Sequence, residues 1–176
     1  KPELQFVGSQ QGGILDSIGN DLGELARKGK LDPLVGREDE LGDIVKILSR
    51  RRKNNPIIVG DAGVGKTVLV EGLAQRLASG RVPPSLREKR IVSLDVASII
   101  AGSRMRGDVE EKVLEIVNEI VESNDTILFI DEIHTILTSG GPGGGSEIAS
   151  ILKPALLRDD FRCIGATTTD EYSSYF

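Results

Sequence analysis

One segment, residues 60–67, constrains the fold of this chain more than any other part of its sequence. It reads Gly-Asp-Ala-Gly-Val-Gly-Lys-Thr and matches the pattern G-x-x-x-x-G-K-[ST] at every position. Residues 56–59 before it are apolar and rich in β-branched side chains, which predicts a short buried strand. After it, apolar residues recur at helical spacing as far as Gly80, which predicts a helix that ends there.

This strand–loop–helix context predicts a binding site for a nucleoside triphosphate. Glycines let backbone N–H groups surround phosphate oxygens, and the helix N-terminus adds the positive end of its dipole. Lys66 would reach the β- and γ-phosphates, and the Thr67 hydroxyl would help to hold Mg²⁺. A glycine-rich turn that merely contains a lysine is the alternative, and the flanking strand and helix disfavour it. The nucleotide-binding residues predicted in this segment are Asp61, Ala62, Gly63, Val64, Gly65, Lys66, Thr67 and Val68.

Length and charge narrow the class of protein. With 176 residues, 39% of them hydrophobic, the chain has the size of one α/β domain with a substantial core. Its net charge of −5 argues against a dedicated binder of nucleic acid or of an anionic membrane. No apolar run is as long as a membrane span, and no signal-peptide pattern opens the sequence.

Helical and extended patterns alternate along the chain, which predicts a parallel β-sheet with helices on both faces. Residues 1–13 are predicted to be a tail or linker and residues 14–176 the folded domain. Asp16 and Asp108 are candidate helix caps, and Pro154 is expected to kink or break a helix. The predicted helices are 14–29, 37–53, 96–101, the segment that follows Asp108, and 146–158; the further predicted strands are 90–95, 126–130 and 161–166.

Three features admit both a structural and a functional interpretation. The basic run at residues 50–53 is typical of a nucleic-acid or nuclear-targeting segment. Cations at a helix C-terminus also complement its dipole, and we favour this interpretation, while a part in contacts between subunits also fits. Cys163 and His134 are each the only residue of their type. We interpret Cys163 as a buried core thiol and His134 as structural.

An acidic pair follows the strand predicted at residues 126–130. A phosphate-binding loop needs an acid at the end of a neighbouring strand to hold Mg²⁺ through its water shell, and Asp131 has that place. Glu132 comes next and is the candidate general base that prepares a water molecule. Thr168 or Thr167, after the last predicted strand, would bring a hydroxyl near the γ-phosphate. Taken singly, an acidic pair is often a solvated strand end and a threonine cluster a helix cap; the complete phosphate loop favours a site.

Longer blocks of sequence resemble the first ATPase domain of the Clp-type AAA+ unfoldases, over roughly residues 15–176. The resemblance implies an α/β P-loop NTPase fold, a three-layer sandwich with a central parallel sheet, of which this chain is the large subdomain. It implies that Thr168 occupies the sensor position and that Leu34 and Val35 pack on adenine. It also implies that the strand before Thr168 lies between the P-loop strand and the strand before Asp131. The blocks are residues 25–33, the P-loop with 70–76, 127–135, 152–156 and 163–168.

The same resemblance implies an activity. Its members bind ATP or ADP with Mg²⁺ and hydrolyse ATP in a homo-hexameric ring that threads unfolded or aggregated protein chains through a central pore. A protease ring or a co-chaperone would be a further partner, and neither nucleic acid nor a membrane is expected. The compartment would be the bacterial cytoplasm or the interior of a plastid or mitochondrion. The implied catalytic residues are Glu132, Lys66 and Thr168, and the implied metal ligands, partly through water, are Thr67 and Asp131.

Two departures from the family pattern bear on this expectation. The main pore loop of the family carries an aromatic residue, whereas the matching residues here are Arg104, Met105, Arg106 and Gly107. Methionine can still grip an extended chain but lacks a flat ring, and a solvated loop between helices is the alternative. The family's arginine fingers, fifth strand and helical lid find no match within residues 1–176. We therefore expect a fragment that binds nucleotide weakly and hydrolyses ATP poorly by itself.

Two other functions compete with an unfoldase module. A nucleotide-gated assembly domain would bind ATP with little or no hydrolysis, and Met105 slightly favours it. The intact set of Lys66, Asp131 and Glu132 favours hydrolysis more strongly. A nucleic-acid motor is disfavoured by the acidic net charge and by the Clp-like blocks.

Overall fold

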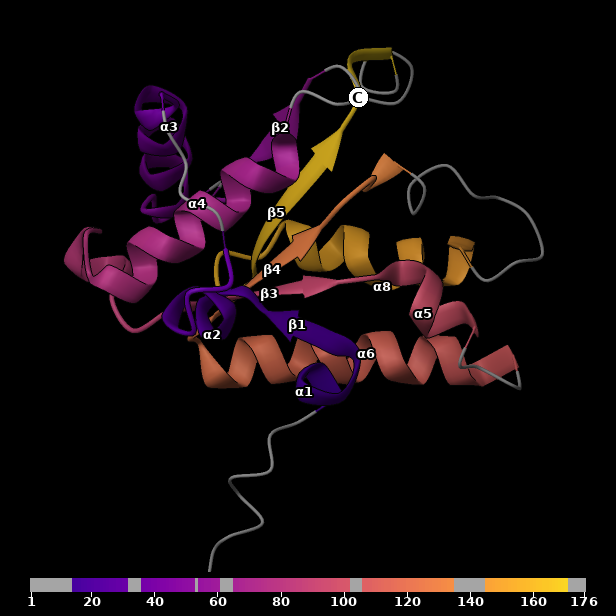
Figure 1. Cartoon of the computed structure of the whole chain (residues 1–176). Helices are drawn as coiled ribbons and strands as arrows, with labels where there is room; N and C mark the ends of the chain where they lie inside the picture. The colour runs from indigo at the N-terminus through magenta and orange to yellow at the C-terminus, as the bar shows by residue number, and fades with distance from the viewer. Residues whose placement is uncertain are drawn as a thin grey trace, which may run out of the picture.

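The computed structural model describes residues 14–31, 36–52, 54–60, 65–101, 106–134 and 145–170. Helices cover both faces of a central five-stranded sheet (Figure 1). The helices are α1 (Ile14–Ile18), α2 (Leu22–Arg27), α3 (Glu38–Leu48), α4 (Lys66–Ser79), the 3₁₀ turn η3 (Pro84–Leu86), α5 (Val96–Ala101), α6 (Arg106–Ser123) and α8 (Gly145–Leu156). The strands are β1 (Gly19–Asp21), β2 (Ile57–Val59), β3 (Arg90–Leu94), β4 (Thr126–Ile130) and β5 (Arg162–Thr167).

The order of the strands brings three strand ends together. The sheet has the order β1-β3-β4-β5-β2, in which β3, β4, β5 and β2 run parallel and β1 runs antiparallel to β3. The predicted position of β5, between the P-loop strand β2 and the strand β4, is confirmed. Because the carboxyl ends of parallel strands meet at one edge of a sheet, the residues after β2, β4 and β5 become neighbours.

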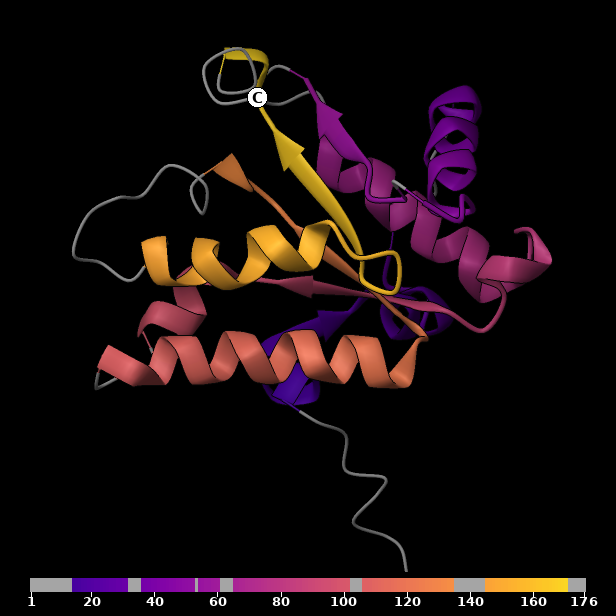
Figure 2. The same ribbon diagram turned by 180° about the vertical axis from the view of Figure 1, so that it is seen from behind.

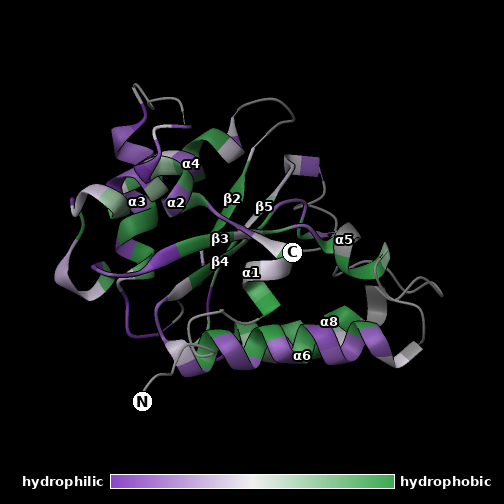
Figure 3. Ribbon diagram, turned by 60° about the horizontal axis from the view of Figure 1, so that its bottom comes forward, coloured by the Kyte–Doolittle hydropathy of each residue, from purple (hydrophilic) through white to green (hydrophobic). Residues whose placement is uncertain are grey.

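Alternating side chains of the strands fill two separate apolar layers. On β4, Ile127 and Phe129 pack with α2, α3 and α4, whereas Leu128 and Ile130 pack with α6 and α8. Seen from behind, α6 and α8 lie side by side across the second face (Figure 2). Colouring by hydropathy shows purple residues along the outer side of α6 and mostly green strands between the helices (Figure 3). The three-layer α/β sandwich predicted from the sequence is confirmed.

Two helices show how the sequence pattern determines the element. Helix α6 buries one stripe that repeats at helical spacing, formed by Val109, Val113, Ile116, Val117 and Ile120. Helix α4 ends where predicted, because Gly80 adopts the left-handed conformation (φ +77°) and its N–H bonds to the Leu77 carbonyl at 3.2 Å. In the described part of the chain, no helix combines the length and the apolar character that crossing a membrane requires.

The helix predicted over residues 14–29 is wrong, because strand β1 divides it. Gly19 lies so close to β3 that an added Cβ would stand 2.4 Å from Cγ1 of Val92. Only glycine permits that approach, and the chain pairs with β3 there instead of continuing the helix. Asp16 lies inside α1 and is not a cap, whereas Asp21 caps α2 by accepting a hydrogen bond from the Glu24 N–H at 3.1 Å.

Three further boundaries differ from the predictions. Helix α3 ends at Leu48, so the described arginines of the basic run follow the helix and are exposed instead of forming its last turn. Helix α6 begins at Arg106, which places Asp108 inside its first turn and not at the cap. Helix α8 continues through Pro154 to Leu156, so the break that the proline could have caused does not occur.

Cys163 is the buried core thiol that the sequence predicts. Its side chain is 1% exposed, and burial raises the pKa of the thiol to about 12. A thiol reagent at pH 8 should therefore leave Cys163 of the folded protein unmodified and should modify it fully in urea. The variant Ser79→Cys, at an exposed end of α4, is the positive control. Labelling of native Cys163 as fast as that control would contradict the prediction.

The pKa of Cys163 also gives a pH dependence. An unfolded thiol ionises near pH 8.5, whereas the folded thiol stays neutral until about pH 12. Its contribution to stability is therefore complete below the unfolded pKa and is lost as the pH rises toward the folded pKa.

Candidate nucleotide site

The N-terminus of α4 is built to receive an anion. Gly65 precedes the helix in a left-handed conformation (φ +81°), and its carbonyl accepts the Leu69 N–H at 3.0 Å. The first turn contains no acidic residue, so no carboxylate there would repel an anion bound at the positive end of the helix dipole. Lys66 opens the helix, and its Nζ donates to the Gly60 carbonyl at 3.1 Å. The Lys66 side chain thus connects the start of α4 with the first residue of the P-loop.

The carboxylate of Asp131, the first residue after β4, contacts the start of this helix, as the sequence predicts. The Thr67 hydroxyl donates to Oδ2 of Asp131 at 3.4 Å, although the two residues are 64 positions apart. The other carboxylate oxygen of Asp131 accepts the Glu132 N–H at 2.9 Å. The hydroxyl and the carboxylate therefore lie close enough to serve one hydrated cation together.

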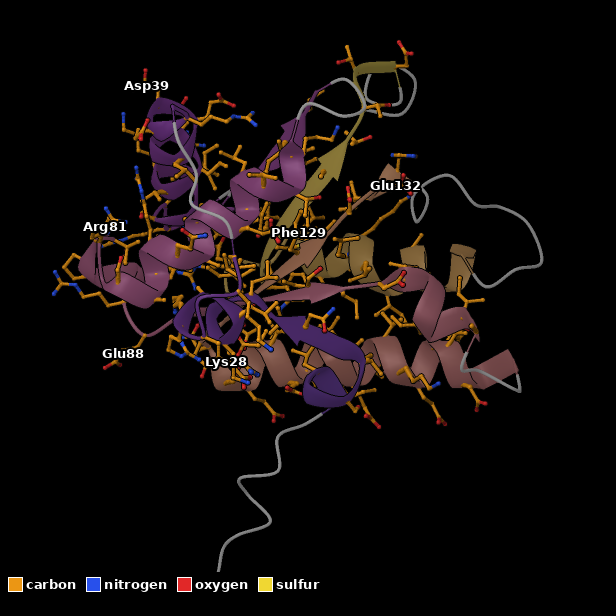
Figure 4. All side chains as sticks on the ribbon, viewed as in Figure 1. Lys28, Asp39, Arg81, Glu88, Phe129 and Glu132 are labelled. Atoms are coloured by element: carbon orange, nitrogen blue, oxygen red, sulfur yellow. The ribbon has the colours of Figure 1, made fainter. Side chains whose placement is uncertain are left out.

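Glu132 has an uncommon backbone conformation. Its φ of +50° lies in the left-handed region, which costs free energy for a residue with a side chain. The next residue fixes the turn, because the Ile133 N–H donates to the Ala166 carbonyl at 3.0 Å and the Ile133 side chain is 3% exposed. Ile133 also packs against Gly165, where an added Cβ would lie 2.9 Å from its Cδ1. Figure 4 shows Glu132 beyond the end of β4.

These parts line an open cavity of about 370 Å³. Its lining combines the start of α4 with the ends of β4 and β5: Gly65, Lys66, Thr67, Asp131, Glu132, Thr167 and Thr168. The predicted catalytic residues and metal ligands are therefore brought together. Val68 is the exception among the predicted residues of α4, because its side chain is 41% exposed and lies outside this lining.

Several predicted residues lie outside the described part of the chain. Of the expected pore loop, Arg106 and Gly107 form the start of α6 and are therefore helical, not part of a loop. The predicted residues that the structure does not describe are Leu34, Val35, Asp61, Ala62, Gly63, Val64, Arg104 and Met105.

Arg37 is a contact of the P-loop that sequence reasoning missed. Its Nη1 donates to the Gly65 carbonyl at 3.2 Å, while Nε and Nη2 bind the carboxylate of Glu40 at 3.1 and 2.6 Å. The hydrogen-bonded pair raises the pKa of Arg37 and lowers the pKa of Glu40. The sequence contains one signal for this ion pair: Glu40 comes three positions after Arg37, a spacing that brings two side chains together on one helical turn. Nothing in the sequence indicated the contact with Gly65.

His134 also has a partner that the sequence did not reveal. Its Nδ1 lies 2.8 Å from Oγ1 of Thr167, and the roles of donor and acceptor depend on the tautomer. Thr167 is 1% exposed, while Thr168 is half-buried at the cavity.

Comparison with known proteins agrees with this geometry. Residues 56–174 match the model of the "ATPase family associated with various cellular activities (AAA)". The chain is 50% identical over 175 residues to the chaperone protein ClpB of Aquifex aeolicus, covering 99% of this chain and 17% of that protein. It is 51% identical over 162 residues to the mitochondrial chaperone protein ClpB4 of Arabidopsis thaliana, covering 92% and 17%.

Solved structures of related proteins also resemble this chain. A structure of the Hsp104:casein complex of S. cerevisiae in an extended conformation superposes with a TM-score of 0.82 at 44% identity, covering 92% of this chain and 28% of that one. The chain thus spans less than one fifth of the length of its ClpB relatives, 17% in both cases above. Because the family model matches more than half of its length, this chain belongs to the AAA family of ATPases.

Proposed function

We propose that the chain is the ATP-binding and ATP-hydrolysing module of a Clp-type protein unfoldase. The observation that carries the proposal is the cavity in which Lys66, Asp131 and Glu132 meet, although they come from separate elements. A bound triphosphate would lie at the N-terminus of α4, where backbone amides and Lys66 neutralise its phosphates. Leu34 and Val35, which precede α3 in the sequence, are proposed to contact the adenine.

The residues present fit a magnesium ion. Thr67 and Asp131 offer the oxygen ligands that Mg²⁺ prefers, and Mg²⁺ usually retains several waters and binds phosphate oxygens as well. Within the described ranges, no cluster of three or more histidine, cysteine, aspartate or glutamate residues forms a separate metal cage. When bound, the ion would supply positive charge to the β- and γ-phosphates.

The reaction itself needs a water molecule activated beside the γ-phosphate. Glu132 borders the cavity next to Asp131 and is proposed to orient and deprotonate that water. Thr168, at the end of β5, is proposed to direct its hydroxyl toward the γ-phosphate or the attacking water. Lys66 would hold the phosphate oxygens on which charge develops in the transition state.

The larger assembly is also part of this proposal. In a homo-hexameric ring, residues 104–107 would face the pore and contact an unfolded or aggregated protein chain, with Met105 in the place of the usual aromatic residue. A protease ring or a co-chaperone is a further proposed partner. Relatives named as bacterial, mitochondrial and chloroplast proteins support the bacterial cytoplasm or an organelle interior as the compartment.

Nucleotide binding and turnover test the proposal directly. In the whole protein, Lys66→Ala should weaken ATP binding about 10- to 100-fold, because a charged hydrogen-bond donor to the phosphates is lost. Lys46→Ala, at an exposed position on α3, is the matched control and should bind as the wild type does. Binding is measured with a fluorescent ATP analogue, and turnover is measured with and without an unfolded protein.

Two results would contradict the proposal. Equal ATP affinity in the Lys66 and Lys46 variants would place the nucleotide elsewhere. Turnover that does not respond to an unfolded protein would separate the ATPase from any unfolding activity.

A further inference from the structure

Thr167 contacts both halves of the candidate site, one through its buried side chain and the other through its backbone carbonyl. Thr167 ends β5 and is 1% exposed. Its hydroxyl lies 2.8 Å from Nδ1 of His134, two positions after Glu132 in the turn that follows β4. Its carbonyl accepts the N–H of Gly60, the first residue of the P-loop, at 3.3 Å. A single residue therefore contacts the start of the P-loop and the turn that carries Glu132.

Packing alone does not account for a threonine at this place. The preceding residues of β5, from Cys163 to Ala166, are buried and carry apolar side chains or none. Valine has nearly the same shape and suits a buried strand, whereas a buried hydroxyl is costly unless it is hydrogen-bonded. The contact with His134 meets this requirement. The hydroxyl is therefore explained by what it binds and not by the volume it fills.

The turn that receives this bond contains the left-handed Glu132. A conformation of this kind persists only where its surroundings hold it. Two contacts hold the residues that follow Glu132: the Ile133 N–H to the Ala166 carbonyl at 3.0 Å, and His134 to the Thr167 hydroxyl. Both contacts come from the last two residues of β5. Removing the His134 contact takes away the side-chain hydrogen bond between this turn and the end of β5.

We propose that Thr167 and His134 are positioning residues that hold Glu132 at the cavity. The consequence for catalysis rests on the proposed ATPase function. Thr167 acts on the turn through His134, whereas Thr168 is the residue of this pair proposed to contact the nucleotide. Loss of the link should therefore lower kcat while the nucleotide affinity, which depends on the N-terminus of α4, changes little.

Substitutions at residue 167 provide the first test, in the whole protein. Thr167→Val keeps the shape and removes the hydroxyl, and it should lower kcat about 10- to 100-fold, the scale expected when a catalytic group is displaced by about 1 Å. Its KM and its affinity for an ATP analogue should stay within about twofold of the wild type. Thr167→Ser keeps the hydroxyl and should restore most of the rate. Thr169→Val is the matched control, because Thr169 is exposed and does not line the cavity.

Substitutions at His134 test the same link from the other side and avoid a change in the core. His134→Leu should lower kcat as Thr167→Val does, whereas His134→Asn, with an amide nitrogen in the place of Nδ1, should retain a large part of the rate. The double variant Thr167→Val with His134→Leu should be no slower than either single variant, because both remove one bond. Full additivity of the two losses would overturn the proposal, as would a Thr167→Val enzyme with the wild-type kcat.

Hydrogen exchange tests the link without any turnover. The Ile133 amide should exchange about 3- to 10-fold faster in Thr167→Val, the change expected from losing one hydrogen bond. Amides of β3 serve as the internal reference. If the wild type fails to hydrolyse ATP, the proposed function fails, and faster exchange at Ile133 still supports the link. Unchanged exchange at Ile133 overturns the link whatever the rate of hydrolysis.

Discussion

Glu132→Gln is expected to lower ATP turnover by the whole protein about 10²- to 10⁴-fold, the usual contribution of a general base. Glutamine keeps the size of the side chain but cannot accept the proton of the attacking water. The affinity for ATP should stay close to that of the wild type, because Lys66 and the N-terminus of α4 are unchanged. The measurement is steady-state ATP hydrolysis beside equilibrium binding of an ATP analogue.

Glu122→Gln is the matched control for this prediction, since Glu122 is exposed on α6 and lies outside the cavity lining. An unchanged rate in Glu132→Gln would exclude Glu132 as the base. The same experiment separates the unfoldase module from a nucleotide-gated assembly domain. A wild type that binds ATP but shows no measurable hydrolysis would support the assembly domain.

The largest loss of stability is expected from Phe129→Ala, at about 3–5 kcal/mol of unfolding free energy. Phe129, labelled in Figure 4, is the fourth of the five residues of β4. Its side chain is 1% exposed, and its register partners are Ser93 on β3 and Ile164 on β5. The sheet on both sides limits how far the structure can close the cavity that the ring would leave. Urea unfolding followed by circular dichroism measures the change.

Leu157→Ala is the control, because it also truncates a large apolar side chain but at a position that is 85% exposed. Its unfolding free energy should change by less than about 0.5 kcal/mol. Similar losses in the two variants would mean that the apolar layer between β4 and α4 contributes far less than its burial indicates.

Local sequence patterns were sufficient to predict the central part of the fold and several residues of the candidate site. The strand–loop–helix around the P-loop, the strand before Asp131 and the buried Cys163 all follow from patterns within a few residues of each other. The family resemblance supplied the position of one strand, and the sheet confirms that β5 lies between β2 and β4. Asp131 and Glu132 follow a strand whose last four residues are apolar, which placed them at the correct edge of the sheet.

The features that the sequence did not reveal depend on contacts between residues that are far apart in the chain. Strand β1 exists because Gly19 approaches Val92 of β3, a contact that helical periodicity does not report. The contact of Arg37 with the Gly65 carbonyl spans 28 positions. The link between His134 and Thr167 spans 33, so the structural role expected for His134 acquired a partner only in the folded chain.

The left-handed backbone of Glu132 has a consequence for how this protein can change. Glycine or asparagine would adopt that turn with less strain, yet neither carries a carboxylate that could take a proton from water. With the general-base role proposed for Glu132, a substitution that relieves the backbone strain would also remove the carboxylate, so stability and turnover would oppose each other at this position.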